Sequence, residues 1–173
     1  MIDPADADTL AAVQRRSYAR ASIALRSSWP ERQALDAAGL ARHLARHRYA
    51  VLATGRADGR PHAAPVAFSV AAATFWFATV EGLRARNLRA TPWASLVVMH
   101  GERDEDEGSE RGEPHVALTA EGPVVLHERD AFAAAWERVR EPWLRRHGEA
   151  PDWAVALAEL RPERIFSHDA AAA

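Results

Sequence analysis

The stretch with the clearest chemical potential covers residues 79–88, where a β-favouring run meets a glycine and then a helix start that carries arginines. Backbone N–H groups at the start of a helix, here near Gly82 and Leu83, favour an anion. Arg84 offers a charged, bidentate contact and Thr79 a hydroxyl, which together suit a phosphate group. The alternative is a plain, exposed basic helix, because such local patterns also arise by chance.

Other catalytic chemistries find little support in the sequence. It contains no P-loop, no dinucleotide glycine fingerprint, no His-Glu-x-x-His and no Gly-x-Ser-x-Gly motif, which argues against an NTPase or a hydrolase. His43 and His47 are four residues apart, but no carboxylate of the same helix completes a metal site. Without cysteine, neither disulfides nor thiolate chemistry are expected. We therefore expect no metal site.

The elements that would position residues 79–88 are mostly strands. Asp36 can cap a helix that ends near Arg48. Three β-favouring runs follow at residues 49–54, 62–70 and 74–79, and the Asp58-Gly59 pair between the first two is a hairpin signal. Three strands in succession predict an antiparallel meander. A short helix over residues 82–90 then interrupts the sheet before Pro92.

The second half of the chain repeats this alternation of strands and single helices. Strands are expected at 94–99 and 115–127, the latter bent at Gly122-Pro123. The segment between them, 101–114, is acidic and glycine-rich, so we expect a mobile, solvated loop. The more specific alternative is a lid that closes over a substrate. Asp130 can cap a helix that Pro142 bends or ends. Two short strands after residue 155 would close the sheet.

This spacing of strands predicts a mainly β fold with flanking helices, in which six or seven antiparallel strands form a barrel rather than βαβ units. The 173 residues, 48% of them hydrophobic, suffice for one core. We expect a helical arm at residues 1–30, a barrel domain at 31–169 and a frayed tail at 170–173. No segment is apolar over the roughly 20 residues that a membrane span needs.

Several motifs in this order resemble the pyridoxamine 5′-phosphate oxidase-like family of split β-barrel proteins that bind FMN or the deazaflavin F420. The matching segments are YAVLAT at 49–54, DGRP at 58–61, APVAF at 64–68, TVEGLRARNL at 79–88, then Pro92 and SLVV at 95–98. A weaker match is the segment LRPERIFS at 160–167. The resemblance covers about residues 40–127 and leaves the first 30 or so unaccounted for.

The resemblance implies a split-barrel homodimer with a cofactor in each cleft between the subunits. Arg84 matches the basic residue that holds the cofactor phosphate, and the neighbouring members of the site would be Thr79, Gly82, Leu83, Arg86 and Asn87. Pro65 and Val66 match the backbone that lies along the cofactor ring, and Ala53 and Thr54 match the adjacent strand edge. The Arg-x-Arg-Asn-Leu form of residues 84–88 leans towards F420 without excluding FMN.

The expected activity is an oxidoreductase that moves hydride or electrons between FMN or F420 and a small molecule whose identity the sequence does not reveal. Vitamin B6 oxidation is doubtful, because the basic, tryptophan-containing carboxy-terminal pattern of true pyridoxamine-phosphate oxidases is missing. The alternative is a non-catalytic carrier of flavin or haem on the same scaffold. No catalytic residue is assigned.

Histidines and tryptophans supply secondary candidates. His62, His100 and His115 could protonate a substrate if they reach the cleft, although each fits an ordinary strand or loop position. An apolar substrate pocket could draw on the tryptophans at 76, 93, 136, 143 and 153, although packing explains most of them equally well.

Charge composition bears on partners and location. The net charge of −2 and the acidic segment 101–114 disfavour a nucleic-acid-binding barrel, despite the arginines and aromatic residues. Residues 1–10 carry acids where a signal peptide would carry a basic and then an apolar run. We expect a cytoplasmic protein with no nucleic-acid or membrane partner.

Overall fold

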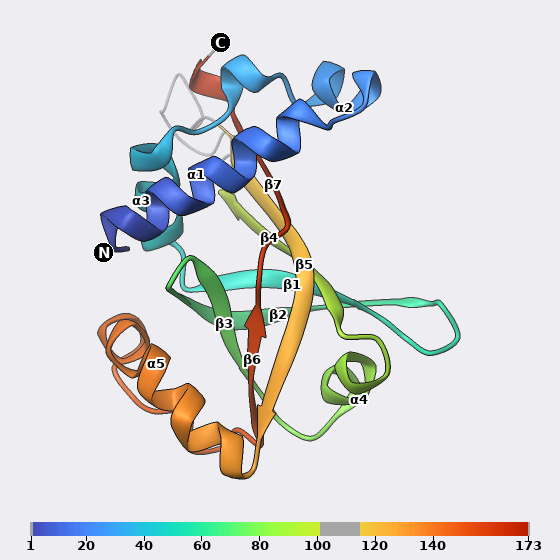
Figure 1. Ribbon diagram of the computed structural model, residues 1–173, viewed down its shortest axis with the longest axis vertical. Helices are drawn as coiled ribbons and strands as arrows, with labels where there is room; N and C mark the ends of the chain where they lie inside the picture. The colour runs from blue at the N-terminus through green and yellow to red at the C-terminus, as the bar shows by residue number, and fades with distance from the viewer. Residues whose placement is uncertain (1, 101–114, 173) are drawn as a thin grey trace, which may run out of the picture.

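The computed structural model describes residues 2–100 and 115–172 as a strand-rich core with helices around it (Figure 1). Its seven strands are β1 (Tyr49–Gly55), β2 (Pro61–Ala71), β3 (Thr74–Thr79), β4 (Trp93–His100), β5 (Val116–Glu128), β6 (Ala156–Leu160) and β7 (Arg164–Asp169). The helices are α1 (Pro4–Ala19), α2 (Ile23–Ser28), α3 (Ala37–Arg46), α4 (Leu83–Ala90) and α5 (Asp130–His147), with short 3₁₀ turns at Glu31–Gln33 and Ala170–Ala172.

Six of the strands close into an antiparallel barrel. The order is β4-β1-β2-β3-β6-β5, and β5 pairs back onto β4, while β7 adds to the outside of this ring by pairing with β5. The β1–β2 hairpin turns at Gly59, which has a φ of 83° that favours glycine. The predicted fold class, an antiparallel split barrel with flanking helices, is confirmed.

The long strand β5 holds the two halves of the barrel together. It pairs with β4 as far as Pro123 and with β6 from Val124 onward, so the expected bend at Gly122-Pro123 is the point where its partners change. A Cβ atom on Gly122 would lie 2.0 Å from the carbonyl oxygen of Arg161. Glycine is therefore required there, because the turn after β6 approaches the backbone of β5 closely.

Strand β3 is buried on both faces. Phe75 and Phe77 point into the barrel core, whereas Trp76 and Ala78 belong to a second apolar cluster that includes Val139 and other residues of α5. This arrangement explains why residues 74–79 are apolar without alternation: α5 covers the outer face.

Helices α1 and α3 pack against one end of the barrel. Asp36 accepts a 2.7 Å hydrogen bond from the backbone N–H of Gly39, which confirms the predicted cap of α3. Leu10 of α1 and Leu40 of α3 are fully buried in the same cluster as the barrel interior. The hydroxyl of Tyr18 donates to the carbonyl of Ser167 on β7 at 2.8 Å. The division into an arm and a barrel domain stays a prediction.

Helix α5 differs from its prediction at both ends. Asp130 is its first helical residue, and the preceding cap position is Arg129, which makes no side-chain capping bond. The helix also continues through Pro142 to His147, because a buried Trp143 anchors the last turn. It ends at Gly148, whose φ of 85° suits glycine. Of the two predicted effects of Pro142, an end of the helix is therefore wrong, and a bend stays a prediction.

Two sequence expectations concern other parts of the chain. Among the described residues, no helix is both long and apolar enough to span a bilayer. The acidic segment 101–114 lies outside the described residues, so the loop and lid alternatives stay predictions.

Candidate functional site

A cleft of about 380 Å³ opens beside the segment that the sequence singles out. Its walls come from the start of β1, the middle of β2, the end of β3, the first turn of α4, the end of α5 and the loop that follows α5. We call it the Arg84 cleft. The residues that line it are Arg48, Tyr49, Pro65, Val66, Ala67, Ala78, Val80, Arg84, Trp143, His147, Glu149, Ala150, Pro151 and Trp153.

Arg84 joins α4 to β2 within this cleft. Its Nη2 donates a hydrogen bond of 3.1 Å to the carbonyl oxygen of Pro65. Burial lowers the pKa of the Arg84 guanidinium from its usual value. No carboxylate among the described residues forms an ion pair with it, so its charge is uncompensated in a half-buried place. A guanidinium in this state fits a phosphate.

The backbone at the start of α4 adds to this preference. Gly82 occupies the N-cap position and, having no side chain, makes no capping bond to the first N–H groups. Those N–H groups, with the positive end of the helix dipole, favour an anion. A helix start and a guanidinium without a carboxylate partner thus lie one residue apart, and phosphate binding by residues 79–88 stays a prediction.

The other predicted site residues do not line the cleft. Thr54 and Asn87 are buried and bond to each other, with 2.9 Å between Asn87 Nδ2 and Thr54 Oγ1. Thr79 is buried, and its hydroxyl donates to the carbonyl of Val80 at 3.2 Å. Arg86 is exposed, whereas Ala53, Gly82 and Leu83 are half-buried. Of the ten predicted residues the structure thus brings Arg84, Pro65 and Val66 into one cleft, and a cofactor contact by the others stays a prediction.

The histidine and tryptophan candidates divide in a similar way. Trp143 and Trp153 line the cleft, the former 2% and the latter 55% exposed. Trp76, Trp93 and Trp136 do not line it, nor do His62 and His115. The side chain of His100 lies outside the described part of the chain.

Sequence reasoning missed two ring-bearing residues of the cleft, Tyr49 and His147. Tyr49 is 65% exposed at the start of β1, and its position as the first residue of the matching segment 49–54 was the signal that could have identified it. His147 donates from Nε2 to the carbonyl oxygen of Phe68 at 3.0 Å. Burial, together with the charges of Arg146 and Arg48, lowers the pKa of His147 despite this bond. A neutral imidazole at neutral pH follows.

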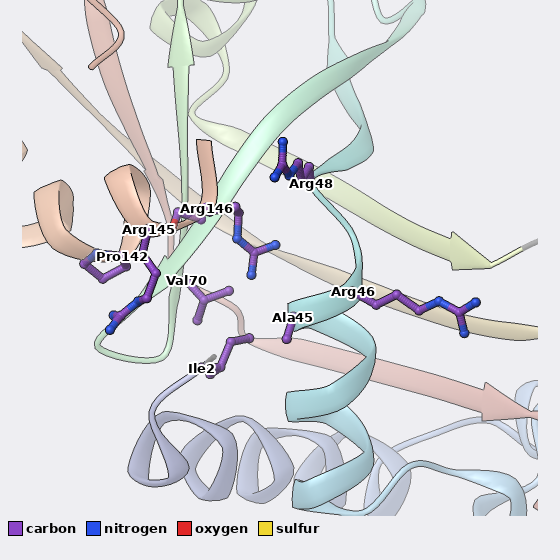
Figure 2. Close-up of a pocket in the computed structure, with 9 residues that line it drawn as sticks. Ile2, Ala45, Arg46, Arg48, Val70, Pro142, Arg145 and Arg146 are labelled. Carbon is purple, nitrogen blue, oxygen red and sulfur yellow. The ribbon is translucent and has the colours of Figure 1, made fainter. Parts of the chain in front are cut away.

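A second cavity, of about 320 Å³, adjoins the cleft through Arg48. It lies where the end of α3, strand β2 and the last turns of α5 meet (Figure 2). We call it the arginine cavity. Its lining residues are Ile2, Ala45, Arg46, Arg48, Ser69, Val70, Pro142, Arg145 and Arg146.

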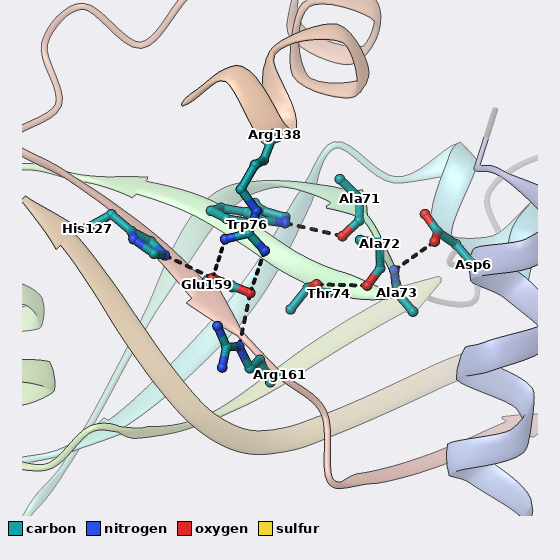
Figure 3. A network of polar contacts seen from close by, with 10 residues as sticks. All are labelled: Asp6, Ala71, Ala72, Ala73, Thr74, Trp76, His127, Arg138, Glu159 and Arg161. Carbon is teal, nitrogen blue, oxygen red and sulfur yellow. Dashed lines mark hydrogen bonds and ion pairs between the residues drawn. The ribbon is translucent and has the colours of Figure 1, made fainter. Parts of the chain in front are cut away.

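A buried carboxylate holds α5, and hence one wall of both cavities, on the barrel. Glu159 of β6 is 2% exposed and accepts hydrogen bonds from Arg138 of α5, from Arg161 and from His127 of β5 at 2.9 to 3.0 Å (Figure 3). The Arg138 guanidinium also lies 4.7 Å from the ring centre of Trp76. These contacts between positively and negatively charged side chains orient α5 on the barrel.

Fold and site together define a class of protein: a split β-barrel with a candidate anion-binding cleft between its second strand and the helix after its third. Residues 38–169 match the sequence profile of the family described as pyridoxamine 5′-phosphate oxidase. The chain belongs to this family, as its motifs predicted.

Solved structures with the same fold support this assignment at the level of architecture. A conserved hypothetical protein from Mycobacterium tuberculosis has a TM-score of 0.67 at 20% identity, covering 83% of this chain and 91% of its own. An FAD-binding protein from Mesorhizobium loti has a TM-score of 0.60 at 19% identity, covering 79% and 96%. The haem storage protein HutZ from Vibrio cholerae has a TM-score of 0.53 at 23% identity, covering 75% and 92%. No curated protein matches the chain.

Proposed function

We propose that this protein is an oxidoreductase that binds FMN or F420 in the Arg84 cleft and exchanges hydride or electrons with a small organic molecule. The observation that carries the proposal is the half-buried Arg84 guanidinium, which no described carboxylate neutralises, at the uncapped start of α4. Both cofactors carry a phosphate group that such a site would hold. The family and the flavin-binding relative point to the same class of ligand.

The surroundings of Arg84 suit a planar ring attached to that phosphate. Tyr49 and Trp153 offer exposed aromatic faces, while Pro65 and Val66 supply a strand backbone on which a ring could lie. The carbonyl of Pro65 accepts a hydrogen bond from Arg84. This bond connects the strand on which the ring would lie with the guanidinium that would hold the phosphate. A cleft of about 380 Å³ is within the range of roughly 300–1,000 Å³ for small-molecule sites.

The bound cofactor would supply the redox chemistry, and the protein would bind it, orient it and exclude water. His147 is the imidazole among the described residues that line the cleft, and its lowered pKa keeps it neutral at pH 7. Since its Nε2 donates to Phe68, Nδ1 is the nitrogen left to accept a proton. We assign it no catalytic step.

We further infer that two copies of the chain pair through the outer face of β1 and β4 and complete the cleft. Large apolar side chains are exposed there: Tyr49 and Val51 on β1, and Trp93 and Met99 on β4, with exposed fractions between 40% and 65%. These strands are neighbours in the barrel, with Val51 opposite Val97. A contiguous apolar face on a sheet is typical of a subunit interface. Tyr49 belongs to both the face and the cleft.

A carrier of haem or flavin is the second candidate, because one of the similar structures is a haem storage protein. Haem needs an axial ligand, and the histidine that lines the cleft already uses Nε2 for the carbonyl of Phe68. A haem would therefore have to bind this histidine through Nδ1, the nitrogen that the contact leaves free.

The test is to titrate the purified protein separately with FMN, F420 and haem, following ligand fluorescence or absorbance. Saturable binding of FMN or F420, followed by turnover of the reduced cofactor with an organic acceptor, supports the oxidoreductase. If the bound cofactor is held tightly but is reoxidised no faster than the free cofactor, the result would instead favour the carrier. Failure of FMN and F420 to bind would overturn the proposal.

A further inference from the structure

The arginine cavity concentrates positive charge in a concave place. Among its nine lining residues four are arginines and none is acidic. In Figure 2 the Arg146 guanidinium reaches into the space between α5, β2 and the end of α3, with Arg48 above it. The Arg46 and Arg145 side chains extend away from Arg146 on opposite sides, so Arg48 and Arg146 are the central cations of the cavity.

Arg146 forms the inner wall of the cavity and is fixed in place. Its Nη1 donates to the carbonyl oxygens of Leu44, at 2.8 Å, and of His47 at the end of α3. Its carbon Cζ lies 4.9 Å from the ring centre of Phe68. Burial, and then the neighbouring charge of Arg48, lower the pKa of Arg146 to about 10. The partly desolvated guanidinium of Arg146 thus lies near the like charge of Arg48, which is exposed.

Compensation from carboxylates is weak. Arg145 pairs with Glu141 at 3.2 Å, but this pair lies on the surface, with Glu141 84% exposed. Within the described part of the chain, Arg48 and Arg146 form no ion pair, and the partners of Arg146 are neutral carbonyl groups. Clustered like charges are normally offset by counter-charges, so this cavity favours an incoming anion.

The remaining lining residues indicate what the anion is attached to. Ile2, Val70 and Pro142 present apolar carbon beside the guanidinium groups, and Ser69 adds a hydroxyl. We propose that the arginine cavity is a second anion-binding site, separate from Arg84, that holds the phosphate or carboxylate group of a small organic ligand. This inference goes beyond the proposed function and does not depend on it, because no residue of the argument requires a bound cofactor.

The anionic group that this cavity would bind can come from two sources: a free inorganic anion, or the anionic end of an organic molecule. We would titrate the full chain, without cofactor and at low ionic strength, with inorganic phosphate and with phenyl phosphate by calorimetry. Tighter binding of phenyl phosphate assigns the site to an organic ligand that uses the apolar wall. Equal binding assigns it to the free anion. Either result supports an anion site, provided that it depends on the cavity arginines.

That dependence is tested with three glutamine variants. Arg48→Gln should weaken binding by about tenfold or more, as expected for a charged contact. Arg145→Gln should weaken it by a smaller factor, about threefold, because Arg145 already pairs with Glu141 on the surface. The control Arg15→Gln removes the same charge from an exposed position on α1, outside the cavity lining, and should change affinity less than twofold. Arg146 is left intact, since it also holds the end of α3.

Three results would overturn the inference. Absence of saturable binding of both probes is the first. The second is an equal effect of Arg48→Gln and Arg15→Gln, which would indicate general charge attraction. In the third, binding is lost in Arg84→Ala but kept in Arg48→Gln, which would place the anion in the Arg84 cleft. Because Arg145 lines the arginine cavity and not the cleft, its variant separates this inference from the proposed function.

Discussion

The side-chain amide of Asn87 donates a buried 2.9 Å hydrogen bond to the hydroxyl of Thr54, which joins helix α4 to strand β1 across 33 residues of sequence. Both residues match motif positions that suggested cofactor contacts. In the structure they hold the helix that carries Arg84 against the barrel. Their effect on the cleft is therefore expected to pass through the position of α4.

This pair can be tested by a double-mutant cycle. Asn87→Ala leaves the Thr54 hydroxyl without its donor, and Thr54→Val leaves the amide without its acceptor. Each should lower the free energy of unfolding by about 1–3 kcal/mol, and the double variant should cost clearly less than their sum. Urea denaturation measures all four proteins. Strict additivity of the two effects would contradict the coupling.

Arg84 and Arg86 make a matched comparison on one helix. Arg84→Ala should weaken the binding of FMN or F420 by about 1.5–3 kcal/mol, because it removes a charged contact in a half-buried cleft. Arg86 is exposed and does not line the cleft, so Arg86→Ala should have an effect within about 0.5 kcal/mol. Fluorescence titration measures both. Equal losses would mean that the phosphate contacts the helix elsewhere.

The Glu159 cluster should make stability depend on acid pH. Burial alone would raise the pKa of Glu159, but the hydrogen bonds from Arg161, Arg138 and His127 outweigh it and lower this pKa to about 2. A carboxyl with a depressed pKa in the folded state stabilises the protein above its unfolded value of 4.5, and this contribution is lost as pH falls towards 2. Its size is on the order of 3 kcal/mol.

The measurement is the unfolding free energy of wild type and Glu159→Gln at pH 6 and at pH 3. The variant should be less stable at pH 6, and its deficit should shrink at pH 3. Glu137→Gln is the control, since Glu137 is exposed and lies 3.7 Å from Arg140 in a surface pair. A deficit that stays constant between the two pH values would show that the carboxylate charge contributes little.

The apolar face of β1 and β4 predicts a dimer that one charge can disrupt. Val51→Arg places an arginine at a position 46% exposed in the single chain, and burying it in an interface would be costly. Light scattering after gel filtration should change from the mass of two chains to that of one. Ile23→Arg, at a residue 89% exposed on α2, should leave the mass unchanged. A monomeric wild type would rule out the proposed assembly.

The close approach of the turn after β6 to the backbone of β5 predicts that alanine substitutions at two glycines differ in their effect on stability. Gly122→Ala would place a methyl group 2.0 Å from the backbone oxygen of Arg161, so we expect a loss of about 1–3 kcal/mol or more in unfolding free energy. Gly55→Ala meets no atom within 4 Å and should cost less than about 1 kcal/mol. Thermal denaturation of the two variants decides the matter. Similar losses would mean that the turn moves away freely.

The sequence by itself determined the elements and the family. The Asp58-Gly59 hairpin, the Asp36 cap and the short apolar runs specify strands and helix starts through local interactions, and these were readable. The ordered motifs of residues 49–98 gave the family, because they depend on spacing along the chain. Arg84 was identifiable since the glycine, the helix start and the cation are neighbours in sequence.

Only the tertiary structure decided which side chains meet. Pro142 stays inside α5 because packing of Trp143 against the barrel outweighs the lost hydrogen bond. Thr54 and Asn87 satisfy each other, and His147 and Arg146 reach their cavities from a helix about 60 residues beyond Arg84. Such contacts join segments that are remote in the chain, so their partners follow from barrel closure and not from local pattern.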